Sequence, residues 1–239
     1  PKNSSIAGEG IVNEGINSTR LGLKGIPALA EHLQIARDLF LLEYTGGKLH
    51  IPTISTKKSV SLIQEAKKKG LDISCSVAVH HLVLTDDELP SFDSKYKVNP
   101  PLRTKEDTKA LRKGVTSGII DIITSDHNPI DIENKKVEFS EAKDGTLGLE
   151  TLFGAVNSVL DPTSFIEAIT CNPRKKFNIS LPKIAEGCQA DITLFNPEGN
   201  HIFSSSDILS TSKNSIFIDK NLKGKAYGIF ANNQLILNQ

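Results

Sequence analysis

The chain has 239 residues, with 28 basic and 28 acidic side chains, three cysteines, and neither methionine nor tryptophan. A chain of this length buries most of its apolar surface, and its balanced charge creates no field that would attract nucleic acid or an anionic membrane. The composition therefore excludes a disordered chain, a disulfide-dense mini-protein and a nucleic-acid-binding protein, and it predicts an ordinary globular protein.

The sequence also predicts the compartment. No apolar stretch approaches the ~20 residues that cross a bilayer, and the first five residues do not resemble a signal peptide. Cys75, Cys171 and Cys188 are isolated and odd in number, which favours free thiols in a reducing compartment. We therefore expect a cytoplasmic protein without a membrane partner. Because the chain begins with Pro1 and not with Met, we also expect it to be part of a longer protein.

Helices and strands are predicted to alternate over the first three quarters of the chain. Residues 1–25 contain five glycines and are predicted to be loop. Apolar spacing, capping residues and terminal glycines predict helices at 27–42, 57–69, 104–113, 149–160 and 162–170. Apolar and β-branched runs predict strands at 49–54, 72–79 and 119–125. This alternation is typical of βαβ units and a parallel sheet.

Beyond about residue 178 the pattern changes to short strands and turns. Strands are predicted at 190–195, 201–203 and 226–237. The Asn232-Asn233 pair inside the last run predicts a hairpin turn. We therefore expect an α/β part over residues 1–178 and a small β domain over residues 179–239.

Polar residues at the ends of predicted parallel strands are the candidate site, because parallel α/β folds carry their chemistry there. Asp126 and His127 follow the run 119–125. Asp126 could bind a metal ion or accept a proton. Equally, Asp126 could cap the next segment while His127 packs. Asn99 and Arg103 flank a rigid Pro-Pro segment and could contact a polar ligand or belong to a plain loop.

Three further histidines lie at or near strands. His80 and His81 follow the run 72–79, and His50 lies within the run 49–54. We expect such histidines to be hydrogen-bonded parts of the structure more often than ligands. The sequence has no P-loop, no Rossmann glycine fingerprint, no Gly-x-Ser-x-Gly elbow and no His-Glu-x-x-His. These absences disfavour nucleotide binding and serine hydrolase chemistry.

A series of motifs runs along the whole chain in a fixed order: Asn13-Glu-Gly, Gly25-Ile-Pro-Ala-Leu-Ala-Glu, Ile35-Ala-Arg-Asp, Ile54-Ser-Thr-Lys-Lys-Ser-Val, His80-His-Leu-Val-Leu-Thr, Lys97-Val-Asn-Pro-Pro-Leu-Arg, Thr124-Ser-Asp-His-Asn-Pro, Gly145-Thr-Leu-Gly-Leu-Glu-Thr, Asn172-Pro and Ala190-Asp-Ile-Thr-Leu-Phe. With these motifs the chain resembles dihydroorotases, which belong to the amidohydrolase superfamily. That family's enzymes interconvert carbamoyl aspartate and dihydroorotate in pyrimidine biosynthesis with one or two zinc ions.

The resemblance implies a (β/α)8 barrel with a small β domain built from both chain ends. A barrel alone takes ~250 residues. We therefore expect this chain to be the second half of a (β/α)8 TIM-type metal-dependent hydrolase barrel with a small C-terminal β domain. The His-x-His metal ligands of the family, its bridging carboxylate and its next His ligand are then expected before Pro1.

Residue by residue, the resemblance assigns Asp126 as metal ligand and general base. It assigns Asn99 as a substrate contact and Gly145 as a glycine whose backbone lines the substrate. Two expected histidines are replaced: Thr53 stands at a metal-ligand position and is not expected to bind zinc, and Ile130 stands where a histidine holds the substrate carboxylate.

A third departure is Asp144, which stands where an aromatic residue precedes Gly145. His50 is not expected to substitute for Thr53, because an offset of three residues along a strand points to the opposite face.

Three functions therefore stay open. The first is a dihydroorotase-like enzyme that uses zinc and a small cyclic amide or carbamoyl amino acid. The second is an inactive homologue that acts as a structural partner, in a homo-oligomer or with another pyrimidine enzyme. The third is another cyclic amidohydrolase, such as an allantoinase or hydantoinase.

Overall fold

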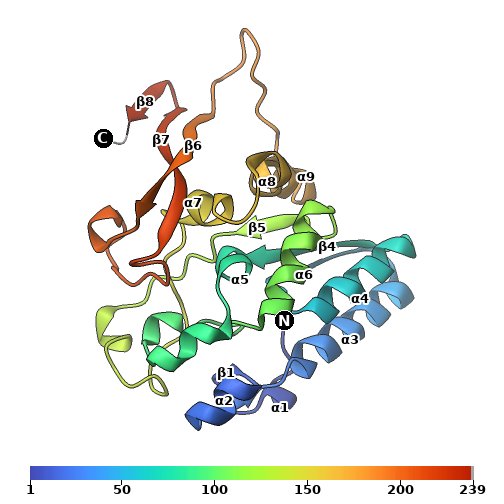
Figure 1. The fold of residues 1–239 in the computed structure, drawn as a ribbon. Coiled ribbons are helices and arrows are strands. Elements are labelled where there is room, and N and C mark those ends of the chain that lie inside the picture. Colours follow the sequence, from blue (N-terminus) through green and yellow to red (C-terminus); the bar gives the residue numbers. More distant parts are fainter. Residues whose placement is uncertain (238–239) are drawn as a thin grey trace.

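The computed structural model describes residues 1–237, which form three small sheets linked by helices (Figure 1). The N-terminal segment contains α1 (Ser4–Ala7), β1 (Val12–Asn13), α2 (Ile16–Leu21) and β2 (Gly25–Ile26), and β1 pairs with β2 in parallel.

The prediction that residues 1–25 are loop is therefore wrong. Two of the glycines there, Gly10 and Gly25, serve close packing: a Cβ atom on Gly10 would lie 2.5 Å from the carbonyl oxygen of Gly25.

The central sheet has three parallel strands in the order β3 (Lys48–Ile51), β4 (Asp72–Ala78) and β5 (Ile122–Thr124). The helices α3 (Leu29–Thr45), α4 (Lys57–Lys68) and α6 (Lys105–Thr116) lie beside one another along this sheet (Figure 1). The predicted alternation of helices with parallel strands is confirmed.

The strand predicted at 119–125 is shorter than expected, because the amide of Ile120 donates to the carbonyl of Gly114 and not to a neighbouring strand. The helices α4 and α6 both have side-chain N-caps. The Thr56 side chain accepts a hydrogen bond from the Ser59 amide, and Thr104 forms a capping box with Asp107.

The remaining helices are α5 (Val79–Val83), α7 (Leu152–Asn157), α8 (Pro162–Ile169) and α9 (Cys171–Lys176), with 3-10 turns at Asp86–Ser91, Ser94–Tyr96, Ile132–Asn134 and Ser205–Asp207. The helix predicted at 149–160 is shorter than expected. The amides of Gly148 and Leu149 donate to His127 Nδ1, so these residues belong to a loop. None of the helices within residues 1–237 combines the length and apolar character needed to cross a membrane.

The C-terminal sheet is antiparallel, in the order β6 (Ile192–Ile202), β7 (Asn221–Ala231) and β8 (Gln234–Leu237). The predicted hairpin turn is confirmed: Asn232 and Asn233 have φ angles of 52° and 59°. The strands predicted separately at 190–195 and 201–203 form one strand. Two shifts of register between β6 and β7 accommodate the irregular segment between them.

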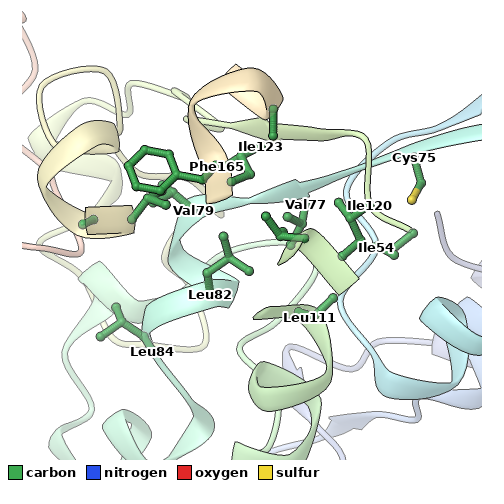
Figure 2. Packing of buried hydrophobic residues seen from close by; sticks show 14 of the residues in the cluster. Ile54, Cys75, Val77, Val79, Leu82, Leu84, Leu111, Ile120, Ile123 and Phe165 are labelled. Carbon is green, nitrogen blue, oxygen red and sulfur yellow. The ribbon is translucent and has the colours of Figure 1, made fainter. Parts of the chain in front are cut away.

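One large hydrophobic cluster joins most of the buried elements, and two small clusters lie near the N-terminal segment. Val77 and Cys75 of β4 are fully buried, together with Phe165 of α8 (Figure 2). Phe217 and Leu222, from the C-terminal part, belong to the same cluster. Residues on both sides of position 178 therefore share a core, and the boundary there stays a prediction.

A buried polar cluster, here called the Glu31–Arg103 network, joins four segments of the chain. The Glu31 carboxylate, 1% exposed, accepts hydrogen bonds from the amides of Ser55 (2.9 Å) and Thr56 (3.2 Å) and from the Ser59 hydroxyl (2.6 Å). These amides directly precede α4, where a helix has no partners of its own for its first N–H groups. Glu31 thus fixes the start of α4 against α3.

Arg103 completes the network from the other side. Its guanidinium lies 3.9 Å from Glu31 and donates to the Ser55 hydroxyl (3.1 Å) and to the Asn13 side chain (2.8 Å). Asn13 in turn donates to the buried carboxylate of Asp86 (2.8 Å). The network therefore ties β1 and the segment before α6 to the α3–α4 pair.

We expect Arg103→Met to lower the free energy of unfolding by about 3–5 kcal/mol, because it leaves the Glu31 carboxylate buried without its cationic partner. The matched control is Arg37→Met, which removes an exposed arginine paired with Asp38 and costs at most about 1 kcal/mol. Chemical denaturation of both variants measures the difference. Equal losses would show that the network does not hold the fold.

Candidate active site

Three polar residues singled out in the sequence follow neighbouring parallel strands. Thr53 follows β3, His80 lies just beyond β4, and Asp126 follows β5. In a parallel sheet these strand ends share one edge. The segment after β3 stays close to β4, because the Thr53 amide donates to the Ser76 hydroxyl at 3.1 Å and the Ile54 amide donates to the Ser76 carbonyl at 2.9 Å. The structure therefore brings these three positions to the same edge.

Asp126 has a left-handed backbone, with φ of 48°, and its side chain is 34% exposed. Burial raises the pKa of this carboxyl above its usual range. His80 Nε2 lies 3.8 Å from Asp126 Oδ2, which is too long for a hydrogen bond.

His80 and His81 differ in their contacts. The His81 Nε2–H donates to the carbonyls of Pro100 (3.1 Å) and Pro101 (3.2 Å), so His81 is hydrogen-bonded structure, as the sequence predicted. His80 is fully buried, and neither of its ring nitrogens has a partner among the described residues. Burial, followed by the neighbouring His81, lowers the pKa of His80 well below its usual value, so its ring is neutral.

Thr53 has an unusual backbone for its residue type. Its φ is 48°, in the left-handed region that β-branched residues rarely adopt and that Asn, Asp and His tolerate better. The expectation that His50 faces away from Thr53 assumed one continuous strand, whereas β3 ends at Ile51, before Thr53. Both His50 ring nitrogens lie against serine hydroxyls, Nδ1 at 2.8 Å from Ser74 and Nε2 at 3.4 Å from Ser76. His50 is therefore held by hydrogen bonds within the sheet.

Gly145 and Ile130 lie in contact. Gly145 has φ of 141°, and a Cβ atom there would lie 2.8 Å from Ile130 Cγ1 and 2.8 Å from Asn128 Nδ2. The amide of Asn128 donates to the carbonyl of Thr146 (2.8 Å). The isolated bridge between His127 and Thr146 continues this pairing. The segment that begins with Asp126 is therefore joined to the segment that begins with Gly145.

Asn99 is exposed and lines a cavity of ≈ 300 Å³ together with Asp144 and Lys97. The Gly145 amide donates to the Lys97 carbonyl at 3.1 Å, and Asn99 follows Lys97 by two residues. The sequence predicted Asn99, Gly145 and Asp126 one by one. The backbone contacts link their three segments.

Two features of the site were not predicted. Lys97 and Lys135 are buried at 5% and 3% exposure and donate to main-chain carbonyls around Asn99 and Gly145. The sequence around these lysines does not indicate that they are buried, because their burial depends on contacts with residues about forty positions away. The position of His80 just after a predicted strand pointed to the site. His81 follows the same strand, so the sequence could not distinguish the two histidines.

The donor atoms at this edge of the sheet do not form a complete metal site within residues 1–237. Within residues 1–237, no group of three or more His, Cys, Asp or Glu side chains is arranged to hold one. Asp126 and His80 supply two donors at the strand ends, whereas a catalytic zinc ion takes three protein ligands. The neutral Thr53 hydroxyl is a poor third donor. The described residues therefore do not fit a complete zinc site by themselves.

Comparison with known proteins assigns the class. Residues 16–227 match the profile of the Amidohydrolase family. The dihydroorotase of Geotalea daltonii is 38% identical over 227 residues, which are 93% of this chain and 53% of that protein. The dihydroorotase of Caldanaerobacter subterraneus subsp. tengcongensis is 41% identical over 229 residues, with the same coverage of each. The chain spans about half the length of these curated relatives.

Solved structures agree on the fold. The L-hydantoinase (dihydropyrimidinase) from Arthrobacter aurescens matches with a TM-score of 0.81 and 25% identity, over 90% of this chain and 50% of that one. The dihydropyrimidinase from Brevibacillus agri NCHU1002 matches with a TM-score of 0.78 and 23% identity, over 89% and 50%. The parallel α/β part is thus of the TIM-barrel type. The chain belongs to the amidohydrolase family, as the resemblance in its motifs predicted.

We expect Gly145→Ala to lower the free energy of unfolding by about 2–3 kcal/mol, because it combines an unfavourable φ with a clash against Asn128 and Ile130. Gly118→Ala is the matched control. Gly118 also has a positive φ, of 71°, but a Cβ atom there meets nothing within 4 Å, so its cost is only about 1 kcal/mol. Thermal and chemical unfolding measure both. A loss at Gly145 no greater than that at Gly118 would contradict the close contact.

Thr53→Asn is expected to raise the free energy of unfolding by about 0.5–1 kcal/mol, because Asn tolerates the left-handed backbone at this position. Thr116→Asn, at the exposed end of α6, is the control and should be neutral or slightly destabilising. Chemical denaturation decides between them, and a destabilised Thr53→Asn variant would show that Thr53 is not strained.

Proposed function

We propose that this chain provides part of a dihydroorotase-like cyclic amide hydrolase, which interconverts dihydroorotate and carbamoyl aspartate. The observation that carries the proposal is Asp126, a half-buried carboxyl group at the end of a parallel strand with its pKa raised by burial. Its segment is joined to that of Gly145. Dihydroorotases that are 38–41% identical to this chain support the choice of substrate.

For the architecture, we propose that residues 1–178 form the second half of a (β/α)8 barrel and residues 179–239 a small β domain. The parallel order β3-β4-β5, followed by an antiparallel sheet, supports this division. The coverage of about half of each relative supports it as well.

Within this proposal, Asp126 is the general base. Its raised pKa suits a group that takes a proton from the attacking water and returns it to the leaving nitrogen. The water oxygen bonds to the amide carbon, the ring C–N bond breaks, and an open-chain carbamoyl amino acid results. Asn99 orients the ring through its amide group, and the Gly145 backbone lines the ligand. Ile130 offers no hydrogen bond to a substrate carboxylate.

The family generally uses a metal, typically zinc, which supplies carbonyl polarisation and water activation when it is bound. Asp126 is the residue of the proposed set that would bind it. The donors within residues 1–237 do not complete a zinc site by themselves.

A second candidate is an inactive homologue that acts as a structural partner, either in a homo-oligomer or with another pyrimidine enzyme. The replacement of two expected histidines by Thr53 and Ile130 favours it. A hydantoinase-like substrate is a third candidate, which the solved structures named hydantoinases support.

The test is hydrolysis of dihydroorotate, hydantoin and allantoin by the full protein, with its zinc content measured by mass spectrometry. We expect Asp126→Asn to reduce dihydroorotate turnover at least about 100-fold without unfolding the protein. Asp131→Asn, an exposed residue of the same loop, is the control and should keep full turnover. A folded wild-type protein with neither metal nor turnover would establish the inactive homologue instead.

A further inference from the structure

Two lysines are buried beside the proposed ligand surface. Lys135 lies in the loop 131–145 between β5 and α7, and Lys97 lies in the segment 94–99. They are 3% and 5% exposed. Lysine is almost never fully buried unless its ammonium group is paired. Within residues 1–237, however, neither lysine makes an ion pair with a carboxylate.

The partners of these lysines are main-chain oxygens. Lys135 Nζ donates to the carbonyls of Ser94 (3.0 Å) and Lys97 (3.1 Å), and these three groups are here called the Lys135 clamp. The Ser94 hydroxyl donates back to the Lys135 carbonyl. Lys97 Nζ donates to the Ser140 carbonyl at 2.7 Å. The loop and the segment therefore hold each other through contacts in both directions.

The Lys97 carbonyl is the centre of this arrangement. It accepts hydrogen bonds from Lys135 Nζ at 3.1 Å and from the Gly145 amide at 3.1 Å. Asn99 follows two residues later. The Lys97 carbonyl oxygen, which accepts from Lys135 in the clamp, therefore also links Gly145 to the segment that contains Asn99.

We propose that Lys135 is a positioning residue, which holds the segment of Asn99 and the segment of Gly145 together as one surface. The ligand that this surface meets rests on the proposed function. The positioning itself is a property of the chain and can be measured without a ligand.

The clamp has a characteristic pH dependence. Burial lowers the pKa of Lys135 to about 8, against 10.5 in water, and burial also lowers the pKa of Lys97. Asp144 and Asp93 attract the Lys135 charge, and Lys97 repels it. An opened clamp returns Lys135 to water and therefore binds more protons than the closed clamp between pH 8 and 10.5. Closure must strengthen as the pH rises through this window. A neutral amine keeps two N–H groups for its two carbonyls.

The test is hydrogen exchange measured by mass spectrometry on the full chain, with protection factors corrected for the intrinsic exchange rate. In Lys135→Met, residues 94–99 and 131–146 should lose protection about tenfold, because two hydrogen bonds from a charged donor are lost. Helix α4 should keep its protection in the same sample, which shows that the variant is folded. Lys136→Met is the matched control, since Lys136 is the exposed neighbour, and it should behave as wild type.

The pH dependence of exchange protection in the wild type is a second test, which does not require any variant to fold. Protection of residues 131–146 should rise several-fold, at most about tenfold, between pH 7 and pH 9. Lys135→Arg should restore protection at pH 7 and lose most of the rise, because a guanidinium does not titrate there. A flat wild-type profile, or full protection in Lys135→Met, would overturn the proposal.

A ligand-binding experiment separates the positioning role of Lys135 from the proposed function. Carbamoyl aspartate is titrated calorimetrically into wild type, Lys135→Met and Lys135→Arg. We expect about tenfold weaker binding in Lys135→Met and recovery in Lys135→Arg. Unchanged affinity in Lys135→Met would overturn positioning of the ligand surface. If the wild type binds none, the proposed function fails, while the exchange experiment still decides whether the clamp positions the two segments.

Discussion

The fold depends on one buried ionic contact, between Glu31 of α3 and Arg103 before α6. The Glu31 carboxylate receives the amides that precede α4, and Arg103 connects it to Asn13 of β1. Two charges this deeply buried are tolerated only when hydrogen bonds satisfy their remaining atoms. Because Ser55 belongs to this network and lies two residues beyond Thr53, the network also sets where the end of β3 presents its residues to the candidate site.

Much of the parallel part could be predicted from the sequence, because α4 and α6 have clear apolar periods and local caps, and β4 is a continuous buried run. The first 25 residues could not, since Gly10 and Gly25 serve close backbone contacts that only the folded chain reveals. For the site, the strand ends pointed to Asp126. The His80 ring, which has no hydrogen-bond partner within residues 1–237, and the burial of Lys135 both depend on segments far apart in sequence, so no local pattern could predict them.

The motifs behind the family resemblance divide into two groups in the structure. Several of their residues, among them Asn13, Glu31 and Arg103, belong to the buried network and hold the segments together. Two of the departures, Thr53 and Ile130, lie instead just beyond β3 and against Gly145. The similarity to dihydroorotases therefore indicates mainly a shared scaffold. The chemistry of this chain depends on the few positions that differ from the family's motifs.

The lysines beside Gly145 have a consequence for evolution. Their acceptors are carbonyl oxygens of Ser94, Lys97 and Ser140, atoms that every amino acid provides. Most side chains of the loop can therefore be exchanged without releasing it from the scaffold. Selection on a ligand could relax at Ile130 and Asp144 while the loop stayed in place. An anchor made to the main chain allows a family to diverge in specificity, or to lose it, without first losing its fold.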